Sequence, residues 1–310
     1  MKPPCTGTTT LAATLDLLDV SPQDRADCVA VVRAADHVLV RQVSDALAQQ
    51  WGAYREAPPH TGITDQNVWL AAYIALAPTV AQRYRELGVP EAVMHATLAD
   101  FGRQLRMHRQ HHGHFGFETW DWLVPHFTGM MFALGRLNFA LHRTELDAPG
   151  IVSRGDWVAG VHVPENGPLC ADSVDHSLCA AAEFFAQYFP DAGVRWGVCK
   201  SWLLDPYLVD HIPDGRIAAY SRRFQTVAPP DVDTTAALYF VFRDRDVERI
   251  RRRHPNREMT SLQRLVVDRA MSGDPWRVVT GALPLGRAAR TAESTFTLGA
   301  EAPSCPSQVP

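Results

Sequence analysis

The segment 157–206 restricts the possible folds more than any other part of the chain, because strand and helix patterns alternate along it. Residues 157–163 are rich in valine and bounded by glycine and proline, which is typical of a short buried strand. A loop at 164–171 and a helix at 177–189 follow, and residues 194–203 form a second strand. A unit of this length predicts a right-handed crossover between parallel strands.

The helix of this unit is expected to start at Ser173 or Asp175, whose side-chain oxygens can accept the free N–H groups of a first helical turn. Apolar residues then recur at helical spacing, at Leu178, Ala181, Ala182, Phe185 and Phe189. In such folds, a helix N-terminus beside a strand end is where anionic ligands bind. The unit therefore predicts a site for an anionic group ahead of the helix.

The composition indicates a globular chain with a sizeable core. Of 310 residues, 46% are hydrophobic and 21% are charged, which excludes disorder of the whole chain. The net charge of −4 argues against a nucleic-acid partner, which requires a basic surface. Asp16 and Asp19 interrupt the apolar segment that a signal peptide would need, and no apolar stretch approaches the ~18 residues of a membrane span. We therefore expect a cytoplasmic protein without a membrane partner.

The first part of the chain has helical periodicity and little strand signal. A serine–proline pair at 21–22 predicts a helix start, with a break in that helix near Asp36. Two more helical blocks are expected, one at 65–87 that can break at Pro78, and one at 90–112. These blocks predict a helical bundle.

From residue 130 onward strands and helices alternate, which predicts an α/β architecture. Besides the 157–206 unit, we expect strands at 131–142, 236–243 and 276–285, and helices at 207–224 (interrupted at 213–215) and 246–271. The aromatic-rich stretch 113–129 is expected to pack between the two halves. We divide the chain into a helical domain at 1–127, a mixed domain at 128–285 and a disordered tail at 286–310.

Five motifs, in this order, resemble those of a known family. They are FALGRLNF (132–139), VHVPENGPL (161–169), SLCAAAEFFAQYFP (177–190), CKSWLLDP (199–206) and AYSRRF (219–224). Together they resemble the acyltransferase-domain proteins of actinobacteria, which join a helical N-acyltransferase domain to a C-terminal domain similar to the GNAT fold. The resemblance covers most of residues 10–285. The chain departs from the family at Asn138, where the family usually has glutamine, and at Val163, where it has isoleucine.

The resemblance implies an α/β fold (mixed α+β), with a GNAT-like mixed sheet after a helical domain. In such a sheet two parallel strands, here 157–163 and 194–203, separate, and the pantetheine arm of an acyl thioester lies between them. Backbone N–H groups released by the separation can hold an oxyanion. The usual GNAT pyrophosphate loop, Q/R-x-x-G-x-G/A, is absent, and only Gly167 occupies the equivalent loop. The expected donor-binding residues are Val163, Asn166, Gly167, Ser173, His176 and Ser177.

Four residues near the strand ends are expected to be catalytic. His162 can take a proton from an attacking amine, because imidazole titrates near neutral pH. Asp205 follows the second strand and can orient His162 or receive the ammonium group. Cys199 and Ser201 share one face of the second strand, where either can protonate the leaving thiolate, and Cys199 can also accept the acyl group transiently. Structural alternatives are a strand-end histidine, an Asp-Pro turn and a core cysteine.

Two further clusters have both structural and functional interpretations. His108, His111 and His112 share a helix face near Glu118, a geometry that can bind Zn²⁺ or Ni²⁺, but the chain has no HExxH motif. We interpret them as a polar helix end with adventitious metal affinity and expect no metal site. The arginine-rich segment 243–253 is either an exposed helix face or a docking patch for an acidic carrier protein.

The expected function is transfer of an acyl group from a CoA or acyl-carrier-protein thioester to an amine acceptor, a peptide or another amino compound, in natural-product biosynthesis. The acyl-CoA or phosphopantetheine thioester is the co-substrate, and no tightly bound cofactor is expected. The alternative is a catalytically silent GNAT-like module that binds an acyl carrier or a partner enzyme. Metal-dependent hydrolysis at the histidine cluster is a third hypothesis.

Overall fold

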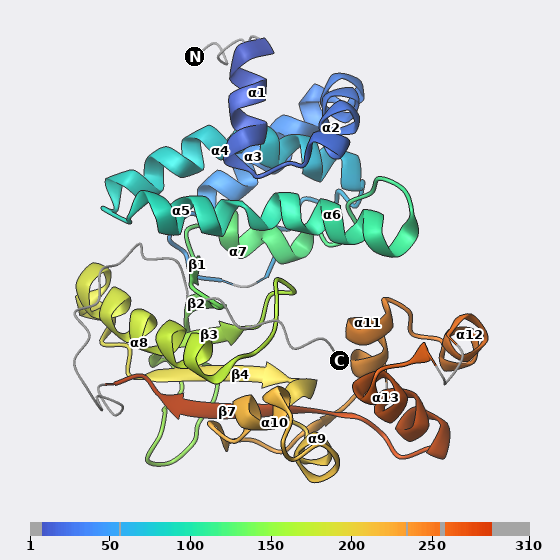
Figure 1. The fold of residues 1–310 in the computed structure, drawn as a ribbon. Coiled ribbons are helices and arrows are strands. Elements are labelled where there is room, and N and C mark those ends of the chain that lie inside the picture. The colour runs from blue at the N-terminus through green and yellow to red at the C-terminus, as the bar shows by residue number, and fades with distance from the viewer. Residues whose placement is uncertain (1–7, 56, 234, 255–257, 287–310) are drawn as a thin grey trace.

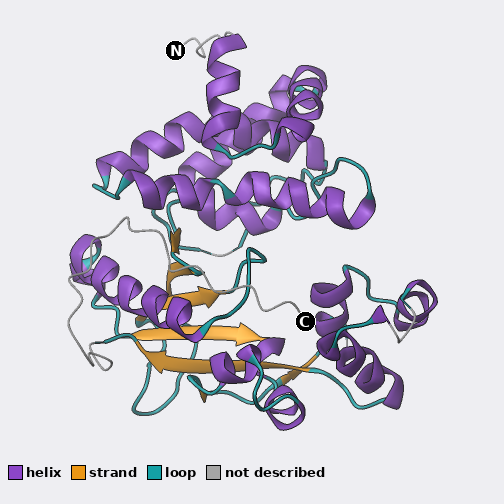
Figure 2. Cartoon of the chain, viewed as in Figure 1, coloured by secondary structure: helices purple, strands orange, loops and turns teal. Residues whose placement is uncertain are grey.

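The structure, a computed structural model, describes residues 8–55, 57–233, 235–254 and 258–286. A layer of helices lies against one end of a mixed β-sheet, and further helices flank the sheet (Figure 1; Figure 2). The predicted tail lies outside the described residues, except for Gly286. No helix in the described part of the chain is long and apolar enough to cross a lipid bilayer.

The helical layer confirms the helical character predicted for the first part of the chain. Its elements are α1 (Thr8–Leu17), α2 (Pro22–Ala34), α3 (His37–Gln49), α4 (Gln66–Glu86), α5 (Glu91–Leu98), α6 (Asp100–His112), the 3-10 helix η1 (Asp121–Leu123) and α7 (Val124–Phe127). Ser21 and Asp36 cap α2 and α3 with their side-chain oxygens, so the predicted break near Asp36 is confirmed. Helix α4 continues through Pro78, and the expected helix at 90–112 is two helices that meet at Ala99.

The sheet has the strand order β1-β2-β3-β4-β7-β5, and β6 also pairs with β7. The strands are β1 (Met131–Leu134), β2 (Leu137–Arg143), β3 (Trp157–His162), β4 (Trp196–Ser201), β5 (Gln225–Thr226), β6 (Asp231–Val232) and β7 (Arg277–Pro284). The prediction of one strand at 131–142 is wrong, because the chain turns at Gly135 and Arg136 and forms a hairpin. Gly135 makes this turn with a φ of +77°, which glycine adopts without strain.

Strands β3 and β4 are parallel, but they pair only at Ala159 with Gly197 and at Gly160 with Val198. Each pairs along its whole length with its other neighbour, β3 with β2 and β4 with β7. Beyond the shared positions β3 continues to His162 and β4 to Ser201 without a ladder between them. The two strands therefore separate toward their C-terminal ends, as the resemblance implies.

Helix α8 (Ala171–Tyr188) connects β3 to β4 and packs on one face of the sheet (Figure 1). The helix begins after Cys170, so the predicted caps at Ser173 and Asp175 are wrong. Ser173 lies inside the first turn, where its Oγ donates a hydrogen bond to the Cys170 carbonyl at 2.9 Å. The loop between β3 and α8 is therefore shorter than the sequence suggested.

The last part of the domain contains α9 (Pro206–His211), α10 (Arg216–Ser221), α11 (Ala236–Phe242), α12 (Val247–Arg253) and α13 (Ser261–Ser272). The interruption predicted at 213–215 is confirmed. The strand predicted at 236–243 is wrong, because these residues form α11. The N–H groups of Thr235 and Ala236, at the start of that helix, are bound by the Asp233 carboxylate. A short apolar run fits a buried strand and a buried helix equally well, and here the aspartate favours the helix.

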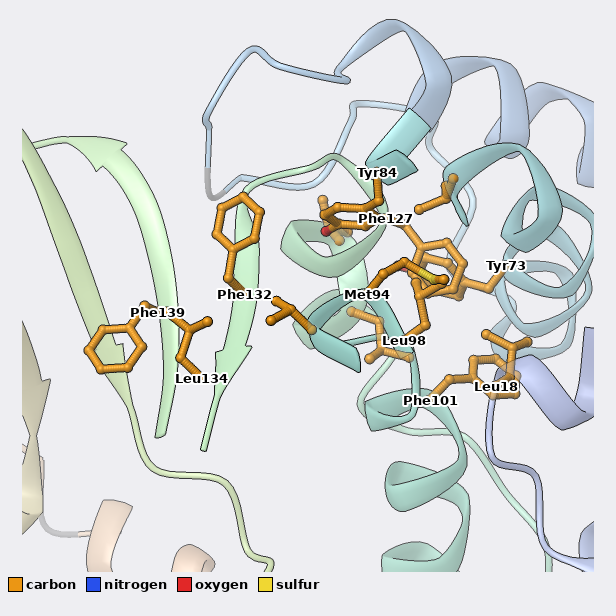
Figure 3. Packing of buried hydrophobic residues seen from close by; sticks show 14 of the residues in the cluster. Leu18, Tyr73, Tyr84, Met94, Leu98, Phe101, Phe127, Phe132, Leu134 and Phe139 are labelled. Carbon is orange, nitrogen blue, oxygen red and sulfur yellow. The ribbon is translucent and has the colours of Figure 1, made fainter. Parts of the chain in front are cut away.

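One hydrophobic core extends from the helical layer into the sheet. Figure 3 shows Tyr84 of α4 between Phe132 of β1 and Phe127 of α7. All three are buried, and the rings of Tyr84 and Phe132 are 5.9 Å apart in an edge-to-face arrangement. The Tyr84 hydroxyl also lies 2.9 Å and 3.0 Å from the carbonyl oxygens of His126 and Met131. This shared core fixes the helical layer relative to the strands that carry the candidate site.

Candidate functional site

A pocket of about 260 Å³ lies where the helical layer meets the sheet. It is lined by Pro58, Asp121, Trp122, Pro125, Met131, Ala140 and His162. The last three come from β1, β2 and β3, whose register places Met131 opposite Ala140 and Ala140 opposite Gly160. The pocket is therefore built from both parts of the chain.

His162 is the titratable group that β3 brings to this pocket. Its Nε2 is buried and has no hydrogen-bond partner among the described residues. A Cβ at Gly160 would lie 3.0 Å from Nε2 of His142 and 3.4 Å from Nε2 of His162, so the glycine leaves room for both imidazole rings. Burial, together with the nearby His126 and His142, lowers the pKa of His162 to about 4, although Asp100 opposes this shift. The imidazole is therefore neutral at physiological pH and can accept a proton, but as a weaker base than an ordinary histidine.

A buried polar cluster supports the ring of Trp122, which lies edge-on to His162 with the ring centroids 5.0 Å apart. The Trp122 indole N–H donates to Asp100 Oδ2 at 2.7 Å, and His126 Nε2 lies 3.1 Å from the same oxygen. Arg103 forms an ion pair with the other carboxylate oxygen. Burial alone would raise the pKa of Asp100, but His126, Arg103 and Trp122 outweigh it and hold that pKa at about 2. The charged carboxylate thus fixes one wall of the pocket.

Asp205 does not lie beside His162. Its Oδ2 accepts hydrogen bonds from Arg269 Nη1 at 2.7 Å and from the Arg277 N–H at 3.0 Å, while Oδ1 accepts the Tyr207 N–H at 3.0 Å. The carboxylate therefore caps α9 and joins it to α13 and β7. This geometry supports the structural interpretation of the Asp-Pro turn.

Cys199 and Ser201 lie on β4, next to the region where the strands separate. Burial raises the pKa of the Cys199 thiol to about 11, although the hydrogen bond from the Tyr220 hydroxyl at 3.5 Å partly opposes this. A thiol with that pKa is a poor nucleophile at neutral pH. The Ser201 Oγ accepts the Leu203 N–H at 3.1 Å, which leaves its own proton available.

Arg136 binds the loop that precedes α8 through several hydrogen bonds. This residue was not identified from the sequence. Its guanidinium donates to the carbonyl oxygens of Pro164, Gly167 and Pro168 and to Asn166 Oδ1, at 2.5–2.9 Å. Burial lowers the pKa of Arg136 to about 10, so the group still carries its charge at neutral pH. The available signal was an arginine in the hairpin turn of the motif FALGRLNF.

The other predicted donor-binding residues occupy different positions. Ser177 is fully buried, and its Oγ accepts the N–H groups of Arg136 and Leu137 at 2.7 Å and 3.3 Å. Val163 is half-buried against the core, and His176 is half-buried in α8. The structure thus brings Asn166 and Gly167 together around Arg136, while Ser173 and Ser177 bind main-chain groups.

Comparisons with known proteins agree with this geometry. A model of the N-acyltransferase N-terminal domain matches residues 9–129, and a model of the GNAT-like C-terminal domain matches residues 131–283. A search of curated proteins found no match.

Solved acyltransferase structures are similar over most of the chain. One, in complex with decanoyl-CoA, has a TM-score of 0.75 and 26% identity, over 90% of this chain and 88% of that one. Another, with decanoyl-CoA and teicoplanin, has a TM-score of 0.70 and 27% identity, over 92% of both chains. A mutant acyltransferase with octanoyl-CoA has a TM-score of 0.71 and 27% identity, again over 92% of both chains. The chain therefore belongs to the two-domain acyltransferases, in which an N-acyltransferase N-terminal domain precedes a GNAT-like C-terminal domain.

Proposed function

We propose that this chain transfers an acyl group from acyl-CoA to the amine of an acceptor, with His162 as the general base. The observation that carries the proposal is the position of His162. It ends β3 where β3 and β4 separate, and its ring lines the pocket at the helical layer. Because the imidazole is neutral and its Nε2 has no partner among the described residues, it is available to an incoming amine.

In the proposed reaction the neutral amine attacks the thioester carbonyl carbon, a C–N bond forms and the carbonyl electron pair moves to oxygen. N–H groups at the separated strand ends stabilise this oxyanion. His162 takes the amine proton, the carbonyl re-forms and the C–S bond breaks. The proton then passes to the CoA thiolate, with the Ser201 hydroxyl as the proposed carrier, so the products are an amide and CoA. The raised pKa of Cys199 favours this direct attack over an acyl-cysteine intermediate.

Three observations favour CoA over a carrier protein as the donor. The charge of Arg136 lies behind the loop that precedes α8, where the phosphates of CoA would bind. The arginines of α12 are mostly paired within the chain, Arg249 with Asp244 and Arg251 with Glu248. Little unpaired positive charge remains there to dock an acidic carrier domain. The similar acyltransferases also bind octanoyl-CoA and decanoyl-CoA.

We propose that the acceptor is an amino compound from natural-product biosynthesis, whose amine enters the pocket at His162. One similar acyltransferase holds teicoplanin together with decanoyl-CoA. A pocket of about 260 Å³ accommodates only the part of a large acceptor that carries the amine. Asp121 is exposed and lines the same pocket, so its carboxylate can attract an ammonium group before deprotonation.

The test is a turnover assay of the whole chain with acetyl-, octanoyl- and decanoyl-CoA, combined with simple amines and a deacylated teicoplanin-type glycopeptide. Thiol release and an amide product identified by mass spectrometry would support the proposal. Binding of acyl-CoA without turnover on any acceptor would favour the alternative, a silent GNAT-like module. Failure to bind any acyl-CoA would contradict the proposal.

A further inference from the structure

The end of α6 carries a cluster that the proposed reaction does not use. His108 and His112 lie one turn apart, and Glu118 returns to them from the loop that follows the helix. One potential ligand atom from each of these residues lies within 4.8 Å of the other two. The two imidazole rings are 4.4 Å apart between centroids. Two histidines and one carboxylate form a common donor set for Zn²⁺.

His108 is held in the orientation that a metal ligand needs. Its Nδ1 lies 3.2 Å from the carbonyl oxygen of His114, so an Nδ1–H donor leaves Nε2 free to bind a metal. The backbone at Gly116 lies against the imidazole ring of His108. A Cβ at this position would lie 2.2 Å from Cε1 and 2.5 Å from Nε2 of His108. Any other residue there would therefore displace the ring and fill the space beside its ligand atom.

His112 and Glu118 already have the spacing of a metal pair. Nε2 of His112 and Oε1 of Glu118 are 3.3 Å apart. Zn–N and Zn–O bonds of about 2.0–2.2 Å at a tetrahedral angle place two ligand atoms roughly 3.4 Å apart. A zinc ion can thus replace the contact between them without moving either side chain far.

The space between these side chains has the size of a single ion. A cavity of about 10 Å³ is lined by His108, His111, His112 and Glu118, among others. This volume holds about one water-sized species. Arg243 also borders the cavity, but its charge is compensated by an ion pair with Glu165, so it does not exclude a cation.

We propose that His108, His112 and Glu118 bind one Zn²⁺ ion, which ties the loop 113–118 to the end of α6. The same segment leads directly to Asp121 and Trp122, which line the pocket at His162. The ion therefore has a structural role, holding the segment that carries one wall of that pocket. This inference does not depend on the proposed acyl transfer, and it replaces the expectation that the chain has no metal site.

The test uses untagged, chelator-treated protein titrated with ZnCl₂ in a calorimeter, with Co²⁺ absorption to report the ligand geometry. We expect one equivalent of Zn²⁺ and a rise in the melting temperature. His108→Ala and Glu118→Gln should each weaken binding by about tenfold or more. His111→Ala is the comparison variant, because His111 is an exposed histidine of the same turn that lines the cavity but contributes no atom to the proposed ligand set.

Absence of stoichiometric Zn²⁺ binding would overturn the proposal. An equal loss of affinity in His111→Ala would also overturn the proposed ligand set, since that result indicates either that His111 binds the ion or that the histidine-rich surface binds it non-specifically. Thermal unfolding of the metal-free variants separates loss of a ligand from misfolding. Variants that unfold at the temperature of the metal-free parent, but lack its shift with Zn²⁺, have lost the ion alone.

Discussion

Nη2 of Arg136, in the turn between β1 and β2, donates a hydrogen bond to the carbonyl oxygen of Gly167, in the loop before α8, at 2.5 Å. The same guanidinium binds the carbonyl oxygens of Pro164 and Pro168. One side chain therefore fixes the carbonyl groups of this loop and places a positive charge behind it. The glycine pattern of a GNAT pyrophosphate loop is absent here, and Arg136 is the feature that organises the loop in its place.

The first prediction concerns Arg136→Lys. Lysine keeps the charge but cannot bind several carbonyl groups in one plane, so the loop loses hydrogen bonds that each contribute about 1.5–3 kcal/mol. We expect the KM for acyl-CoA to rise by about tenfold while kcat changes little. Steady-state kinetics with decanoyl-CoA measure both. Arg223→Lys is the control, because Arg223 binds the exposed Asp175 of α8. An unchanged KM in the Arg136 variant would contradict the role of this residue.

The second prediction concerns His162→Ala. Removal of a general base lowers kcat by about 10²–10⁴-fold, and we expect a loss in this range with little change in acyl-CoA binding. His211→Ala, an exposed histidine of α9, should retain the parent activity. Thiol release gives kcat, and titration with a non-reactive CoA thioether gives donor affinity. Full activity in the His162 variant would exclude this residue as the base.

The third prediction concerns the pH dependence of stability, which follows from the lowered pKa of His162. Its pKa is about 4 in the folded state, below the ordinary 6.5, so the unfolded chain binds the proton more readily between these values. The contribution of neutral His162 to the free energy of unfolding is therefore at its full value above about pH 6.5. It decreases by on the order of 3 kcal/mol as the pH approaches 4. Urea denaturation at pH 7 and pH 5 should show a smaller decrease in His162→Asn than in the parent. Equal decreases would show that His162 is not buried in its neutral form.

The sequence predicted the parts of the fold that depend on local patterns. The crossover from β3 through α8 to β4 follows from periodicity, and the separation of these strands agrees with the family resemblance. The prediction failed at α11, because an apolar run of seven residues carries no period that distinguishes a strand from a helix. Asp233, three residues before the run, determined the outcome through its bonds to the first N–H groups of the helix.

The candidate site was harder to predict, because tertiary contacts create it. His162 was identified from its place at a strand end, but its low pKa comes from burial near Trp122 and His126, about 40 residues earlier in the chain. Arg136 was missed because its partners lie in a loop about 30 residues later. Composition and periodicity do not encode such pairings between distant segments.

The fourth prediction concerns the donor. Arg249→Glu, Arg251→Glu and Arg252→Glu together reverse the charge of α12 without touching the pocket. Because α12 contributes no residue to the pocket at His162, we expect the folded variant to turn over acyl-CoA within about twofold of the parent, although the new carboxylates beside Asp244 and Glu248 lower its stability. Kinetics with decanoyl-CoA and with the same acyl group on a carrier protein provide the comparison. A carrier donor that outperforms CoA in the parent, and loses that advantage in the variant, would contradict the choice of CoA.

The last prediction separates the structural role of Asp205 from the catalytic one expected from the sequence. Asn in its place removes the ion pair with Arg269, both members of which are almost fully buried. Breaking such a pair costs about 3–5 kcal/mol, so we expect Asp205→Asn to lower the free energy of unfolding by this amount. The kcat of the folded fraction should stay near that of the parent, because Asp205 does not contact His162.

Asp274→Asn is the matched control, since Asp274 is the half-exposed partner of the same arginine and its loss should cost about 1 kcal/mol or less. Urea denaturation and kcat, measured on both variants, test the structural role of Asp205. A fall in kcat without a loss of stability would instead show that Asp205 has a catalytic role.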